Sequence, residues 1–205
     1  MLDRSILREL STLGEKADTV ALHLVAAAML IDEDPTKALA HARVAREKAS
    51  RLATVREAAG IVAYQAGVWE EAIRDLRAAR RMSGDQTQLP VIADCERALG
   101  RPERAIELMS GPEIAGLAEP IRAECAIVHS GARRDLGEKD SAIYVLEAFG
   151  LEDSKDPDVQ VRLWYAYADA LLEADRKAEA REWFGKVAAL DSEQITDAAE
   201  RVASL

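Results

Sequence analysis

The chain has 205 residues, of which 37 are acidic and 27 basic, so it carries a net charge of −10. Hydrophobic residues make up 49% of it and aromatic residues only 4%, with 39 alanines and no asparagine. Alanine is the strongest helix former, whereas strands and hairpin turns favour β-branched, aromatic and Asn-Gly sequences. The composition therefore excludes an all-β protein, and the acidic balance makes a nucleic-acid partner unlikely, because such proteins usually carry a basic excess.

A helix of about residues 2–13 is expected first, followed by a short pattern that recurs five times. Each copy contains a turn, the start of a helix, and an alanine followed in four of the five copies by an apolar residue. The alanines are Ala38, Ala72, Ala105, Ala142 and Ala180, with spacings of 34, 33, 37 and 38 residues. A period near 34 is typical of arrays of helical hairpins. The repeats are predicted at residues 15–50, 51–84, 86–111, 119–150 and 157–191, and a final helix at 192–204.

The repeated alanines are predicted to be the points of closest contact within each hairpin, where only a methyl group fits. One helical turn later, a larger apolar side chain should fill the space beside the contact. The residues at this second position are Leu76, Met109, Leu146 and Phe184, and only Ala42 is undersized. The preceding helix carries its own small residue, which is Ala26, Gly60, Ala93, Ser130 or Ala168.

This pattern resembles the tetratricopeptide repeat (TPR), in which a Trp-x2-Leu-Gly-x2-Tyr helix is followed by Ala-x3-Phe and then by proline. The last repeat is the most similar, with Trp164, Tyr167 and Ala168 followed by Ala180 and Phe184 at the motif's spacing. All five copies lack the final proline, and the fourth is irregular because Ser130 occupies the small position.

The resemblance covers about residues 15–191 and implies an all-α fold. The expected architecture is a right-handed α-solenoid of about five TPR-like hairpins, with an extra helix at each end, in a single domain over residues 1–205. The sequence of residues 55–60 and 89–97 is similar to sequences of actinobacterial TPR proteins of unassigned activity. The preference for arginine over lysine agrees with a GC-rich bacterial genome. The resemblance carries over no catalytic residue.

Helix-terminating and helix-capping residues support the hairpins. Asp34 and Asp156 each precede a proline and are expected to cap the helices that follow. Gly84 and Gly150 follow helical segments and are expected to end them.

No segment of the sequence is long enough to cross a membrane. The longest apolar stretch, residues 20–31, is interrupted by His23 and is shorter than the roughly 20 residues that a bilayer requires. Residues 1–4 lack the basic start and apolar run of a signal peptide. We therefore expect a cytoplasmic protein that makes no membrane contact.

The sequence contains no catalytic motif: no glycine-rich phosphate loop, no GxSxG and no HExxH. His23, His41 and His129 lie in three different predicted helices, although His23 and His41 can face each other within the first hairpin. Cys95 and Cys125 form no CxxC pair, which favours buried free thiols over a disulfide. We expect no enzyme activity, no metal and no cofactor.

The sequence instead predicts a surface that binds another protein. The first helices of the hairpins line the concave side of such a solenoid, and counting from the small residue places side chains in that groove. The candidate groove residues are Glu57, Tyr64, Asp94, Arg97, Arg134, Tyr165 and Asp169. The same count also nominates His23, Ala27, Leu30, Ile31, Ile61, Gln65, Ala98, Ile127, Leu172 and Glu173. Tyrosine and arginine are frequent anchors at interfaces, and the alternative for each residue is a solvated helical face.

The predicted function is a non-catalytic scaffold or adaptor that binds a partner peptide or helix in the concave groove, or that self-associates as a homo-oligomer. The alternative is a regulatory protein that binds RNA or a small ligand through arginine-rich faces. The arginines concerned are Arg74, Arg77, Arg80, Arg81, Arg101, Arg104, Arg133 and Arg134. A solvated face whose arginines pair with Glu70, Glu71 and Asp75 would explain the same pattern.

Overall fold

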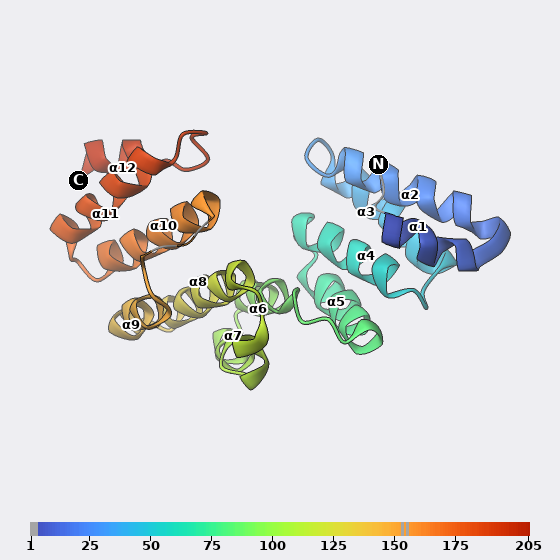
Figure 1. Ribbon diagram of the computed structural model, residues 1–205, viewed down its shortest axis with the longest axis horizontal. Helices are drawn as coiled ribbons and strands as arrows, with labels where there is room; N and C mark the ends of the chain where they lie inside the picture. Colours follow the sequence, from blue (N-terminus) through green and yellow to red (C-terminus); the bar gives the residue numbers. More distant parts are fainter. Residues whose placement is uncertain (1–3, 153, 155) are drawn as a thin grey trace. The chain divides into compact units, whose positions relative to one another are not determined.

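Helices account for all the regular secondary structure in the residues that the computed structural model describes, which are 4–152, 154 and 156–205 (Figure 1). The predicted all-α fold is confirmed. The chain divides into two units, Met1–Leu99 and Gly100–Leu205, each with its own internal contacts.

The first unit contains two complete hairpins. Its helices are α1 (Arg4–Leu10), α2 (Ala17–Leu30), α3 (Pro35–Lys48), α4 (Ala53–Gln65), α5 (Trp69–Ser83) and α6 (Leu89–Ala98), with a 3-10 segment at Ser11–Lys16. Helix α2 packs against α3 and helix α4 against α5, and α4 also contacts α3 (Figure 1). These pairs correspond to the first two predicted repeats.

The second unit contains the fourth and fifth predicted hairpins, α8 with α9 and α10 with α11. Its helices are α7 (Pro102–Met109), α8 (Glu119–Asp135), α9 (Lys139–Phe149), α10 (Pro157–Glu173), α11 (Lys177–Leu190) and α12 (Ala198–Ser204), with a 3-10 segment at Pro112–Gly116. The unit boundary falls between α6 and α7, so the third predicted repeat is divided between the two units. A single continuous domain stays a prediction.

The predicted contact positions are buried. The five repeated alanines are all 0% exposed, and Leu76, Met109, Leu146 and Phe184 are buried beside them. The closest approach is at Gly60 in α4, where an added Cβ would lie 2.6 Å from Leu76 Cγ and 3.1 Å from the Leu76 backbone nitrogen. Because a real Cβ does not approach other atoms so closely, the α4–α5 contact requires glycine at this position.

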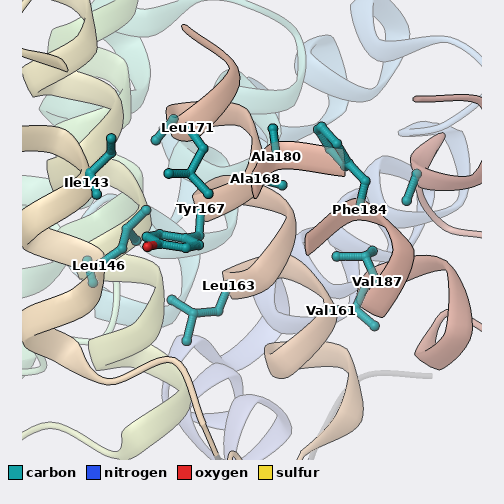
Figure 2. Close-up of a cluster of buried hydrophobic side chains, with 13 residues drawn as sticks. Ile143, Leu146, Val161, Leu163, Tyr167, Ala168, Leu171, Ala180, Phe184 and Val187 are labelled. Carbon is teal, nitrogen blue, oxygen red and sulfur yellow. The ribbon is translucent and has the colours of Figure 1, made fainter. Parts of the chain in front are cut away.

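A buried apolar cluster of the second unit is built mainly from α9, α10 and α11, with Ala126 of α8 and Ala198 of α12 at its edges (Figure 2). Leu163, Tyr167 and Leu171 of α10 lie toward α9, where Tyr167 donates a hydrogen bond to Glu147 Oε1 at 2.7 Å. On the other side of α10, Val161 lies beside Val187 of α11. Two aromatic residues of the last repeat, Tyr167 and Phe184, are therefore part of this buried cluster.

The caps are as predicted. The side chain of Asp34 accepts a hydrogen bond from the Lys37 backbone N–H at 3.0 Å, and Asp156 accepts one from Asp158 at 3.0 Å. Gly84 ends α5 in the left-handed conformation with φ of 76°, which is accessible to glycine without steric cost.

The two end helices differ from the prediction. The predicted 192–204 helix begins only at Ala198, because the Asp191 carboxylate accepts hydrogen bonds from the backbone N–H groups of Ile195 and Thr196, both at 2.9 Å, and holds that segment in a turn. Ile195, which lies in this turn, is 54% exposed. Helix α1 ends at Leu10, and its predicted start at residue 2 lies outside the described residues.

We predict that Gly60→Ala destabilises the protein, although alanine normally favours a helix interior over glycine by about 0.5–1 kcal/mol. The new Cβ would overlap Leu76, and overpacking of this kind costs roughly 1–3 kcal/mol. Gly185→Ala is the matched control, because Gly185 lies inside α11 with nothing within 4 Å of its added Cβ. Urea unfolding should show a lower midpoint for Gly60→Ala and an equal or higher one for Gly185→Ala. If both variants were stabilised, the close contact at Gly60 would be disproved.

Candidate protein-interaction surface

The clearest hollow in the first unit lies between α1, α2 and α4 and has a volume of about 520 Å³. Its lining residues are Ile6, Leu24, Ala27, Ala28, Ile31, Thr54, Glu57, Ala58, Ile61, Val62 and Gln65. The α4 members recur every three or four residues and so occupy one face of that helix. Five residues nominated for the groove from sequence line this hollow: Ala27, Ile31, Glu57, Ile61 and Gln65.

Few polar groups interrupt this apolar lining. Glu57 receives a hydrogen bond from Gln88 Nε2 at 2.8 Å through its Oε1 atom. The Thr54 hydroxyl is buried and has no hydrogen-bond partner among the described residues. An unpaired buried polar group is costly, but the Thr54 hydroxyl oxygen is itself covered and is not open to the hollow. The hollow can therefore accept an apolar group.

Three further candidate residues of the first unit form one polar cluster. Tyr64 of α4 donates to Asp94 Oδ2 at 2.8 Å, and Arg97 Nη1 donates to Asp94 Oδ1 at 2.9 Å. Burial, followed by the hydrogen bond to Asp94, raises the pKa of Tyr64. These side chains therefore link α4 to α6, and any partner would meet them already engaged with one another.

The candidate residues of the second unit form a similar cluster across α8, α10 and α12. Arg134 of α8 binds Glu173 and lies 3.5 Å from Asp169 Oδ2, both on α10. Tyr165 of α10 donates to Asp197 Oδ1 at 2.5 Å. The hydrogen bond to Glu173 is the largest cause of the raised pKa of Arg134.

Two members of this second cluster, Asp197 and Arg201, are not among the residues predicted from the sequence. Arg201 of α12 lies 3.1 Å from Asp197 and 3.9 Å from Asp169, so it joins both acids. The spacing of Asp197 and Arg201 at i and i+4 was the available signal. This spacing alone does not predict the cluster, because the segment from residue 192 onward is expected from sequence to be one end helix.

A second hollow, of about 470 Å³, lies in the second unit and mixes charges. Glu119, Arg122, Cys125 and His129 of α8 line it together with the end of α9. The Arg122 Nε atom is buried without a hydrogen-bond partner in the described part of the chain. Burial, and then the charge of Arg133, lowers the pKa of His129. None of the candidate groove residues lies here.

The arginine-rich faces are engaged in ion pairs within the protein. Arg77 Nη2 lies 2.8 Å from the buried carboxylate of Glu96, and Arg74 lies 3.4 Å from Glu71 and 3.5 Å from Asp75. In the next unit Arg133 lies 2.6 Å from Glu138. This arrangement agrees with the alternative of a charge-paired face rather than with a basic patch.

Two buried carboxylates of α5, Glu71 and Asp75, each bind more than one arginine. Asp75 is 0% exposed and binds Arg46 of α3 and Arg56 of α4, each at 2.5 Å. Glu71 binds Arg43 at 2.7 Å and Arg46 at 2.5 Å. The cluster therefore joins the first hairpin to the second. The hydrogen bond from Arg43 is the largest cause of the lowered pKa of Glu71.

His23 and His41 face each other, with their Nδ1 atoms 2.8 Å apart. Among the described residues no group of three or more His, Cys, Asp or Glu side chains could hold a metal ion, and no helix there is long and apolar enough to cross a membrane. Cys95 and Cys125 are buried free thiols, as predicted.

The comparisons with known proteins support the fold. No family model and no curated protein sequence matches the chain. A crystal structure of nearly identical TPR-like repeats of a kinesin light chain from Podosopora anserina is similar, with 15% identity and a TM-score of 0.63 over 86% of this chain and 96% of that one. Pseudomonas aeruginosa pilF is similar with 14% identity and a TM-score of 0.61 over 92% of this chain and 89% of that one. The chain is thus an α-helical repeat protein with a TPR-like fold, the class to which the sequence pattern points.

We predict that the stability difference between the wild type and Glu71→Gln depends on pH. Ionised Glu71 stabilises the fold above its ordinary pKa of 4.5, and this stabilisation is lost as the pH falls through its lowered folded-state pKa. At pH 7 the variant should lose roughly 1.5–3 kcal/mol, the usual contribution of charged hydrogen bonds. Urea unfolding should show a smaller difference in the free energy of unfolding between the wild type and the variant below pH 4.5 than at pH 7. Glu70→Gln, at an exposed neighbouring position, is the control; an equal gap at both pH values would contradict the assignment.

We also predict that neither cysteine of the folded protein reacts with Ellman's reagent near pH 8. Burial raises the pKa of Cys95 to about 12 and that of Cys125 to about 11, so almost no thiolate is present, and the thiols are inaccessible. Both should react once urea unfolds the chain. Rapid labelling of either thiol in the native protein would show that its helix is not packed as described.

Proposed function

We propose that this protein is a non-catalytic scaffold or adaptor that binds a peptide or helix of a partner protein on the first-helix side of its repeats. The observation that carries the proposal is the apolar hollow between α1, α2 and α4, which contains Ala27, Ile31, Glu57, Ile61 and Gln65. Pockets of several hundred Å³ that are mostly apolar, with a few polar groups, are usual binding sites. The TPR-like fold supports a general role in protein interaction.

The two polar clusters have a supporting role in this proposal. Tyr64, Asp94 and Arg97 hold α4 against α6, and Arg134, Tyr165 and Asp169 hold α8, α10 and α12 in place. The apolar contact in the hollow supplies the binding energy, because burial of apolar surface is the main favourable contribution to association.

Binding of RNA or a small ligand through the arginine-rich faces has less support. The arginines that would bind phosphate are held by carboxylates, as Arg77 is by Glu96 and Arg133 by Glu138. A phosphate would have to displace these acids, and the whole chain carries a net charge of −10. We propose a protein or peptide partner and a cytoplasmic, bacterial setting.

We predict that a photo-reactive residue at Gln65, which is exposed at the rim of the hollow, captures the partner in a native lysate. Ile61→Gln should reduce capture about tenfold or more, because it places an amide in the apolar lining. The matched control is a photo-reactive residue at Tyr144 of α9, which is 69% exposed and lies outside the hollow. Mass spectrometry identifies the captured protein. Circular dichroism verifies that Ile61→Gln keeps its helices. Binding in the hollow would be refuted by equal capture from Tyr144. It would also be refuted if Ile61→Gln left the capture unchanged.

A further inference from the structure

Helix α2 has a second apolar side that the fold leaves uncovered. Its inner side, with Val20, Leu24 and Ala27, is buried. On the opposite side Leu22 is 70% exposed and Met29 is 74% exposed. These two residues are seven positions apart, so they share one face of the helix. A helix that is apolar all round is normally buried on every side.

In a repeat array the side of a hairpin that faces away from its successor is covered by the preceding hairpin or by a polar cap. The small residues Gly60, Ala93 and Ala168 are buried, whereas Ala26 at the same position in α2 is only half-buried. Nothing in the described part of the chain covers the outer side of α2.

The helix that was expected to cap this end lies elsewhere. Leu10 of α1 is buried with Val20, Leu24 and Val55, and Ile6 lines the hollow between α2 and α4. The Glu9 carboxylate accepts a hydrogen bond from the Ala53 backbone N–H, at the start of α4, at 3.2 Å. Helix α1 therefore closes one end of the groove and leaves Leu22 and Met29 exposed.

The distribution of charge indicates what can cover this surface. Residues 1–99 contain 15 acidic and 14 basic side chains, whereas residues 100–205 contain 22 acidic and 13 basic side chains. Nine of the ten net negative charges therefore belong to the second unit. Two copies of the chain can meet through their first units with little repulsion, whereas contact through the second units would oppose two strongly acidic surfaces.

The outer side of the first hairpin is also complementary to itself. The contact between His23 and His41 sets the register of the antiparallel helices α2 and α3, so Asp18 lies near the level of residue 46 and Leu22 near that of residue 42. Exposed Asp18 stands on the same face as Leu22 and Met29, while α3 carries exposed Lys48 and half-buried Val44. Acid on one helix and lysine on the other is the arrangement that a two-fold interface can use.

We propose that the outer side of the first hairpin, formed by Asp18, Leu22 and Met29 of α2 with Val44 and Lys48 of α3, joins two copies of this chain in a two-fold dimer. With the axis parallel to the helices, α2 of each copy lies on α3 of the other. Leu22 then meets the partner subunit's Val44, and Asp18 meets the partner subunit's Lys48. The contact covers the exposed apolar face and pairs opposite charges.

This interface is separate from the groove, which uses the Leu24, Ala27 and Ile31 side of α2. The dimer would present two grooves, so a partner with two binding segments would be bound more tightly than by one chain. The inference stands on the exposed face of α2 and does not require the groove to bind anything.

Analytical ultracentrifugation of the full chain over a range of concentrations tests the proposal. The wild type should approach twice the 22.4 kDa mass of one chain at high concentration. Leu22→Glu combined with Met29→Glu should weaken dimerisation on the order of 100-fold, because it buries charge at the centre of the interface. Tyr144→Glu, at a similarly exposed residue of α9, should leave the dimer unchanged, as should the groove variant Ile61→Gln. Circular dichroism verifies that each variant keeps its helices.

A charge exchange tests the register. Asp18→Lys or Lys48→Asp alone should weaken the dimer by setting like charges against each other, and the two changes together should restore it. A wild type that stays monomeric at the highest concentration, or one whose dimer survives Leu22→Glu with Met29→Glu, overturns the proposal. Capture of a different protein through Leu22 by a monomeric chain overturns it as well. Failure of the exchange to restore the dimer overturns the two-fold arrangement of α2 on α3.

Discussion

Each hairpin of this protein depends on two helices approaching so closely that a methyl group is the largest side chain that fits between them. In the α4–α5 pair the approach is closer still, and Gly60 leaves room for Leu76. A buried alanine recurs once in each repeat, and in four of the five repeats a larger residue one turn later is buried beside it. The abundance of alanine and the scarcity of aromatic residues follow from this requirement, since packing density is maintained through many small contacts.

Ion pairs and polar clusters then connect one helix pair to the next. On the second-helix side Asp75 and Glu71 bind arginines from neighbouring helices, and on the first-helix side Tyr64 reaches Asp94. Removing one member of a buried pair leaves an uncompensated charge, so these residues depend on one another. Arginines of the arginine-rich faces, such as Arg77 and Arg133, are likewise held by carboxylates of the protein itself.

Among the described residues, helix α2 keeps two uncovered apolar sides after these contacts are made. One is the hollow between α1, α2 and α4, and the other is the outer side that carries Leu22 and Met29. An apolar helix with two uncovered sides is costly for a soluble monomer unless each side has an occupant. The proposed partner segment would cover the hollow, and the proposed second copy would cover the outer side. The two contacts use different residues.

The sequence by itself determined the all-α fold, the positions of the close contacts and the caps at Asp34 and Asp156, because these depend on helical periodicity and on interactions within a few residues. It also placed Glu57 and Ile61 on the face of α4 that proves to be hollowed. Only the tertiary structure decided that Tyr64 and Arg97 share Asp94, that α1 lies beside the hollow, and that α12 starts at Ala198 rather than residue 192. Those outcomes depend on contacts between residues far apart in the chain, or on competition between a turn and a helix. Short-range sequence patterns predict neither of these.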